Sequence, residues 1–244
     1  MKSGIHGAGI AGNDPDKDNG HALVFEENGM NMKTRGLWLS AASGLVLICL
    51  ALPTPLCAQN TQTKPFKQEE LDQLLAPIAL YPDDILTPIL MASTYPIEVV
   101  QAERWVKQNK KLKGDALKAA LAKQSWDASV KSLVPFPDIL SMMSDKLDWT
   151  QKLGDAFLAQ QKDVMNTVQK LRAKAVGAGY LKSSQEQEVK KEGDIIIIEP
   201  ANPQVIYVPT YNPMIVYGTW WYPAYPPYEV YVYPAGTAFV AFTV

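Results

Sequence analysis

The chain has 244 residues, a formal net charge of −2 at pH 7, and only two cysteines and two histidines. This length accommodates one large domain, or a medium domain with extensions. The nearly balanced charge gives no electrostatic reason to expect binding to nucleic acid or to an anionic membrane.

The pattern of an export signal lies near the N-terminus. Two basic residues, Lys33 and Arg35, precede an apolar core at residues 37–52, and Leu56-Cys57-Ala58 fits a cleavage site. We therefore expect residues 32–58 to be a signal peptide that directs the protein to the periplasm or cell envelope.

The sequence leaves two interpretations of residues 1–31. They precede a signal that should begin the chain, so we expect them to be an upstream extension absent from the native protein. The apolar core of the signal is shorter than the roughly 20 residues that a membrane span needs. The alternative is that the signal stays uncleaved as a single inner-membrane anchor, with residues 1–31 as a cytosolic tail.

Cleavage after Ala58 would remove every cysteine and histidine, because Cys49 and Cys57 lie in the signal and His6 and His21 precede it. The exported chain would then lack a Ser-His-Asp or Cys-His relay and the ligands that zinc prefers. We therefore predict no catalytic residue of these kinds, no metal site and no cofactor. The remaining 19 Lys+Arg and 20 Asp+Glu predict no nucleic-acid partner, and a membrane partner only if the signal is uncleaved.

Helical patterns follow a polar lead-in at residues 59–66, which we expect to be flexible. Apolar residues at 71, 74, 75 and 78 have the spacing of one helical face, and Pro77 is expected to end that helix. Tyr-Pro pairs at residues 81–82 and 95–96 predict two further helices, because proline is favoured in a first helical turn.

The helical domain as a whole is placed at residues 67–180. Three more helices are predicted within it, at residues 114–123, from Pro137 to Met143, and at residues 149–176. Asp148 is the expected N-cap of the last helix, and the glycines of residues 177–179 are expected to end it, since glycine tolerates left-handed geometry.

The pattern then changes to strands. Residues 181–193 are expected to be a charged linker, and residues 194–218 a small β meander. Runs of β-branched residues predict strands at residues 195–198, 205–208 and 215–217. An Asn-Pro pair precedes each of the last two runs, so the repeat is expected to form a two-strand unit.

Residues 219–244 are rich in Trp, Tyr and Pro and are expected to be an extended tail. Four tyrosines recur there at intervals of three, which in a polyproline II helix places the rings along one edge. Contiguous exposed aromatic rings mark interaction surfaces. The alternative is that the segment folds back over the helical domain. The predicted binding residues are Tyr207, Tyr217, Trp220, Trp221, Tyr222, Tyr225, Tyr228 and Tyr231.

Two long stretches resemble the domain-of-unknown-function 3300 family of exported proteins from Gram-negative bacteria. They are LLAPIALYPDDILTPILMASTYPIEVVQAERWV (residues 74–106) and EPANPQVIYVPTYNPMIVYG (residues 199–218), and the resemblance covers roughly residues 69–233. It implies a signal peptide and an envelope location, and it supplies no catalytic residue because the family has no assigned reaction. Many members have a longer, Gly-rich and aromatic C-terminus, so the tail is expected to be truncated at Val244.

The carboxylates that a hydrolase would need have simpler explanations. Neighbouring Asp83 and Asp84 point about 100° apart on a helix, and acids at a helix start complement its dipole. Glu98 and Glu103 also diverge, and Glu103 with Lys107 at i, i+4 predicts an ordinary surface pair. The exported part contains no Ser-x-x-Lys pair and no Gly-rich phosphate loop.

The sequence thus predicts an α+β fold: a mainly α-helical domain followed by a small β meander and an extended Pro/Tyr-rich tail. The favoured function is a non-enzymatic binding or scaffolding module whose partner is an envelope protein or a cell-wall glycan. Two alternatives are a carboxylate-based glycan hydrolase or lyase, and an inner-membrane-anchored assembly factor.

Overall fold

A computed structural model of the chain describes residues 65–231 and 237–243. Residues 60–244 form one compact unit with a continuous apolar core of their own. The predicted upstream extension, the signal peptide and most of the lead-in fall within residues 1–64, outside the described residues.

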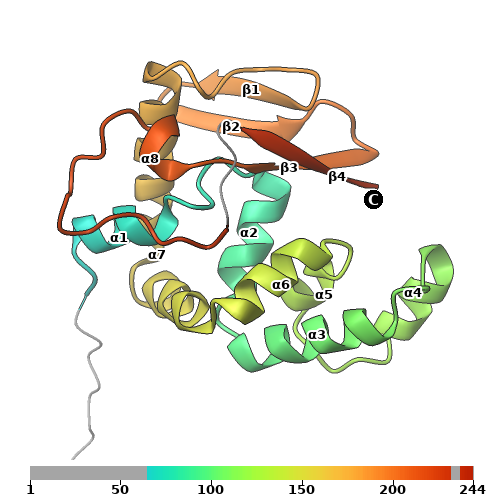
Figure 1. Cartoon of the computed structure of the whole chain (residues 1–244). Helices are drawn as coiled ribbons and strands as arrows, with labels where there is room; N and C mark the ends of the chain where they lie inside the picture. Colours follow the sequence, from blue (N-terminus) through green and yellow to red (C-terminus); the bar gives the residue numbers. More distant parts are fainter. Residues whose placement is uncertain (1–64, 232–236, 244) are drawn as a thin grey trace, which may run out of the picture. The chain divides into compact units, whose positions relative to one another are not determined.

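Seven helices come first in the described part of the chain (Figure 1). Their bounds are α1 Gln68–Leu75, α2 Asp83–Ala92, α3 Pro96–Gln108, α4 Gly114–Leu121, α5 Ala128–Leu133, α6 Pro137–Asp145 and α7 Leu147–Gly177. The two Tyr-Pro pairs do begin helices, because α2 starts just after Pro82 and α3 starts at Pro96. The short helix α5 was not predicted from the sequence.

The long helix α7 differs from its prediction in two details. Asp148 lies in its first turn, so the prediction that it caps the helix is wrong. The helix also bends at Gln160, where φ is −145° and ψ is 46°. The side chain of Gln160 there accepts a hydrogen bond from the backbone N–H of Phe66 (2.6 Å) and donates one to its carbonyl (3.2 Å), which ties α7 to the chain before α1. At the other end, Gly179 takes a positive φ of 81°.

A fully buried arginine, Arg172 on α7, joins three other segments. Its guanidinium donates hydrogen bonds to the carbonyls of Ala79 (2.9 Å), Tyr81 (3.0 Å) and Ile196 (2.7 Å). It also forms an ion pair with Asp83 at the start of α2 (2.7 Å). A buried charge is tolerated only when it is paired and hydrogen-bonded, so these contacts hold α7, α2 and the turn between α1 and α2 in one arrangement.

The first strand pair lies partly in the expected charged linker. Strand β1, Gln187–Glu192, pairs antiparallel with β2, Ile195–Pro200. Buried Gln187 and half-buried Val189 alternate with the exposed Glu188, and Lys190 forms an ion pair with Glu199 across the pair. The charged side chains of residues 187–192 obscure this alternation in the sequence, and the isoleucines of β2 supply the apolar surface.

The second strand pair corrects the expected two-strand unit. Strand β3, Val205–Thr210, pairs antiparallel with β4, Ala238–Thr243, while the predicted strand at residues 215–217 is wrong. Residues Pro213–Val216 form instead a short helix, α8, which Asn212 caps by accepting the N–H of Met214 (2.9 Å). Asn202 accepts the N–H of Gln204 in the same way (2.9 Å), and two β-branched residues follow each of the two turns. The first run, Val205-Ile206, lies in a strand that pairs with β4, whereas the second, Ile215-Val216, lies in α8.

The α+β class predicted from the sequence is confirmed: helices are followed by small antiparallel strand pairs in the described part of the chain. The core is built by α1, α2, α5, α6 and α7 and is extended by Ile196 and Ile198 of β2. Trp126 is buried and meets the half-buried Trp105 edge to face, with ring centroids 5.9 Å apart.

Replacing Arg172 by Met should destabilise the protein by about 3–5 kcal/mol, because Asp83 loses its cation and the carbonyls of Ala79 and Tyr81 lose the donor that Arg172 supplies. The free energy of unfolding in urea measures this loss. Arg104→Met is the matched control, since Arg104 is exposed on α3 and its replacement should change stability by about 0.5 kcal/mol or less. Equal losses in the two variants would contradict the role of Arg172.

Gly154 lies where α7 crosses the corner between α2 and α3. A Cβ there would meet the Ser93 carbonyl oxygen and lie 2.7 Å from its carbonyl carbon. Gly154→Ala should therefore cost about 1–3 kcal/mol of stability, because the backbone must shift. The control is Gly177→Ala on the same helix, where nothing lies within 4 Å and a gain of up to about 1 kcal/mol is expected. Thermal unfolding of both variants tests the opposite signs.

Candidate binding site

The predicted aromatic segment folds back over the helical domain, which was the alternative raised by the sequence. Of the eight predicted binding residues, Tyr217 and Trp220 are buried and none is fully exposed. The half-buried residues are Tyr207, Trp221, Tyr222, Tyr225, Tyr228 and Tyr231. The rings therefore present parts of their surfaces and do not stand free in solvent.

Four consecutive predicted rings are brought together. The ring centroids of Tyr217 and Trp220 are 6.3 Å apart, those of Trp220 and Trp221 are 4.4 Å apart, and those of Trp221 and Tyr222 are 6.1 Å apart. The indole N–H of Trp220 donates to the carbonyls of Tyr222 (3.1 Å) and Tyr225 (2.9 Å). These hydrogen bonds curl the segment around the buried Trp220 ring.

Asp72 of α1 connects this series to the helices. Its carboxylate is fully buried and accepts from the indole N–H of Trp221 (2.7 Å), the amide of Gln68 (2.6 Å) and the ammonium of Lys170 on α7 (3.0 Å). Three charge-assisted hydrogen bonds compensate the buried charge. The carboxylate thus holds Trp221 over the seam between α1 and α7.

Lysines of α7 border the aromatic surface. The ammonium of Lys174 lies 3.9 Å from the centroid of Trp221, and that of Lys170 lies 5.8 Å from the centroid of Tyr222. Lys152 donates to the hydroxyl of Tyr228 (3.1 Å), and this hydrogen bond raises the pKa of Lys152. The surface therefore combines aromatic rings with adjacent ammonium groups.

Two buried tyrosines fix where the segment begins. The hydroxyls of Tyr211 and Tyr217 both donate to the carbonyl of Ala76 (3.0 and 2.7 Å), and the Tyr211 hydroxyl accepts the N–H of Leu80 (3.2 Å). They satisfy backbone groups that the turn after α1 leaves unpaired. Tyr217 therefore has a structural role, and the sequence reasoning did not single out Tyr211.

The later tyrosines do not form the uninterrupted edge that was expected. The N–H of Tyr225 donates to the carbonyl of Tyr222 (2.9 Å), which closes a turn, whereas a polyproline II helix has no internal hydrogen bonds. Beyond that turn, Tyr228 donates its N–H to Gln73 of α1 (3.4 Å), and the hydroxyl of Tyr231 accepts from Tyr81 (3.2 Å). In the described residues no ring contact joins Tyr207, on β3, to this series.

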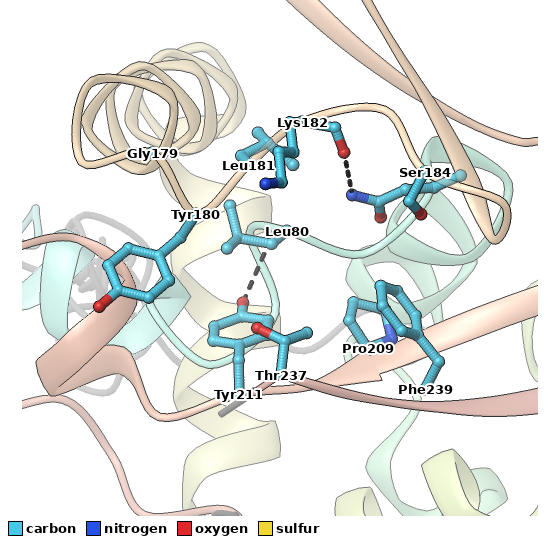
Figure 2. Close-up of a pocket in the computed structure, with 11 residues that line it drawn as sticks. Leu80, Gly179, Tyr180, Leu181, Lys182, Ser184, Pro209, Tyr211, Thr237 and Phe239 are labelled. Carbon is cyan, nitrogen blue, oxygen red and sulfur yellow. Dashed lines mark hydrogen bonds between the residues drawn. The ribbon is translucent and has the colours of Figure 1, made fainter. Parts of the chain in front are cut away.

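A separate pocket of about 380 Å³ lies between the chain that follows α7 and the β3–β4 pair (Figure 2). Leu80, Tyr180, Leu181, Pro209 and Phe239 form its apolar walls, and Figure 2 shows the hydrogen bond from Leu80 to the Tyr211 hydroxyl at its base. The volume lies in the range of small-molecule sites.

Gln187 gives this pocket a polar group without a partner. Its amide N–H donates to the carbonyl of Lys182 (3.2 Å), which fixes the orientation of the amide. Its Oε1 atom is buried and has no hydrogen-bond partner among the described residues. A hydroxyl or N–H donor would remove the cost of this unpaired acceptor. The sequence reasoning missed Gln187, although the alternation of Gln187 and Val189 before an apolar strand is a signal that could have found it.

Three of the carboxylates considered for hydrolysis, Asp83, Glu98 and Glu103, have a structural partner, and Asp84 is exposed in the first turn of α2. Asp83 pairs with Arg172 and accepts the N–H of Ile198 (3.2 Å). Glu98 accepts the N–H of Asp127 (2.6 Å), and Glu103 forms the predicted ion pair with Lys107. Glu103 is nevertheless only 6% exposed, so the carboxylate end of this ion pair is buried and the pair is not an ordinary surface pair.

Residues 65–231 and 237–243 contain no cluster of three or more His, Cys, Asp or Glu side chains arranged to bind a metal ion. None of their helices combines the length and apolar character needed to cross a membrane.

Comparisons with known proteins place the chain in a family. It matches the model described as protein of unknown function (DUF3300) over residues 67–243. It is 45% identical over 208 residues to the Uncharacterized protein YacH of Escherichia coli strain K12, covering 72% of this chain and 33% of that protein. The chain thus spans about a third of the length of this curated relative. No solved structure matches it. Because the matched region includes almost the whole described structure, the chain belongs to the DUF3300 family.

Proposed function

We propose that the protein is a non-enzymatic binding or scaffolding module of the cell envelope. Its partner is a cell-wall glycan or an envelope protein, and the contact surface is the aromatic segment at residues 220–228. The export signal predicted at residues 32–58 supports the location.

The observation that carries the proposal is the way this segment is held. Trp220 and Trp221 are anchored by hydrogen bonds, and Tyr222, Tyr225 and Tyr228 stay half-buried. Lys170 and Lys152 of α7 lie beside Tyr222 and Tyr228. Aromatic rings fixed before a partner arrives lose little conformational entropy on binding. Rings with adjacent ammonium groups suit the apolar faces of sugars and nearby carboxylates, as well as a proline-rich or acidic peptide.

The hydrolase alternative is less well supported by the same contacts. General acid and base catalysis needs two carboxyl groups that reach one bond from opposite sides. Asp83 is engaged by Arg172, and Glu98 is engaged by a backbone N–H. These contacts support a structural role for both carboxylates and so favour the binding proposal over the hydrolase.

Retention on isolated cell wall tests the glycan form of the proposal. The double variant Tyr222→Ala/Tyr225→Ala should bind at least about fivefold more weakly than the unmodified protein, since each stacked ring contributes about 0.5–1.5 kcal/mol. The matched control is Tyr95→Ala/Tyr180→Ala, which removes two tyrosines that are 42% and 48% exposed elsewhere. Co-sedimentation with the wall gives both affinities.

Three results would contradict the proposal. The first is weaker retention of the control variant alone, which would place the wall-binding site at Tyr95 or at the pocket that Tyr180 lines. The second is release of soluble wall fragments that stops in a Glu98→Gln variant, which would indicate an enzyme. The third is a photo-cross-linker at residue 225 that captures neither wall nor envelope protein in living cells.

The alternative of an inner-membrane-anchored assembly factor predicts a different N-terminus. A cleaved signal leaves a native protein that begins at Gln59, whereas an anchor leaves residues 32–58 in place. N-terminal sequencing of the protein isolated from the envelope separates the two. A start at Met1 or Met32 would favour the anchored assembly factor.

A further inference from the structure

Positive charge gathers in one part of this nearly neutral chain. Residues 103–123 contain seven lysines and arginines against two carboxylates, a net charge of +5 in a chain whose total is −2. The rest of the chain therefore carries −7. We call residues 103–123 the basic arm; it comprises the second half of α3, the connection to α4, and α4 itself with two residues beyond it.

Most cations of the basic arm are exposed to solvent. Lys107 pairs with Glu103, and that hydrogen bond raises the pKa of Lys107. The others are exposed and form no ion pair in the described part of the chain: Arg104, Lys110, Lys111, Lys113, Lys118 and Lys123. The helix dipole favours a lysine in the last turn of α3 but not the three that follow it. Like charges so close together repel, so the folded chain gains no stability from them.

An apolar groove of about 850 Å³ lies beside these lysines, between α3, the start of α6 and the end of β4. Half-buried Trp105 lines it together with Leu112, Leu117 and Phe242. Lys107, Lys110 and Lys113 line the same groove. Helix α4 contributes no buried residue, and in Figure 1 it projects past the end of α3.

We infer that the basic arm binds the anionic surface of a lipid bilayer, with its lysines at the headgroup phosphates and the Trp105 groove receiving apolar lipid groups. Basic segments that combine a tryptophan with amphipathic helix are typical of proteins that lie on membranes. The lysines are spread from residue 107 to residue 123 and do not converge on one point, which fits an extended surface better than one small anion. This membrane contact is additional to the proposed function and uses another part of the protein.

Vesicle binding tests the inference with residues 60–244, which hold the core and exclude the apolar signal. This protein should bind phosphatidylcholine vesicles that contain phosphatidylglycerol, and not pure phosphatidylcholine vesicles. The triple variant Lys110→Gln/Lys111→Gln/Lys113→Gln should bind about 100-fold more weakly, because each lysine near an anionic membrane contributes a similar share of the binding free energy. Binding of the unmodified protein should also fall as salt is raised.

The control Lys162→Gln/Lys182→Gln/Lys191→Gln removes the same charge from exposed sites outside the basic arm and should bind like the unmodified protein. Equal loss in both triple variants, or no dependence on phosphatidylglycerol, would overturn the inference. Binding of the basic arm to isolated wall without binding to vesicles would overturn it as well and assign the arm to a wall polymer. The Tyr222→Ala/Tyr225→Ala variant should bind vesicles as the unmodified protein does. Failure of the membrane inference can therefore be told apart from failure of the proposed aromatic binding site.

Discussion

The buried guanidinium of Arg172 is the interaction on which the rest of the structure depends. It joins α7 to the start of α2, to β2 and to the turn between α1 and α2. That turn presents the Ala76 carbonyl, which accepts from Tyr211 and Tyr217 at the start of the aromatic segment. A charged group in the core therefore determines, through two tyrosine hydroxyls, where the surface rings lie.

The helices could be predicted from the sequence to a large extent, and the strand pairing could not. Apolar spacing and the Tyr-Pro pairs are local signals, so α1, α2, α3 and α7 were found close to their true positions. The partner of β3 is β4, which follows it only after α8 and the aromatic segment, and no local pattern encodes such a pairing. The two Asn-Pro pairs make the same side-chain cap and are followed by the same pattern of residues, yet one leads into a strand and the other into a helix. The difference is tertiary, since β3 pairs with β4.

The candidate site was predictable in composition but not in exposure. The rings of residues 217–231 were identified from the sequence, yet their burial follows from hydrogen bonds to Asp72, Gln73 and Ala76, far away in the chain. Arg172 and Asp72 look like surface charges in the sequence, and only tertiary packing shows that they are buried. The basic arm is not apparent from the net charge of the chain. Its positive charge is balanced in that sum by negative charge elsewhere in the sequence.

The pairing of β4 with β3 has a mechanical consequence for the aromatic segment. Residues 211–231 follow β3 and pack on the helical domain, and β4 then pairs with β3, so the segment lies in a loop that the strand pair closes. Closing a loop removes most of its large-scale motion. A force applied to the chain after β4 would act first on the β3–β4 hydrogen bonds. It would act on the aromatic segment only after β4 had separated from β3. The strand pair therefore protects the rings from tension transmitted along the chain.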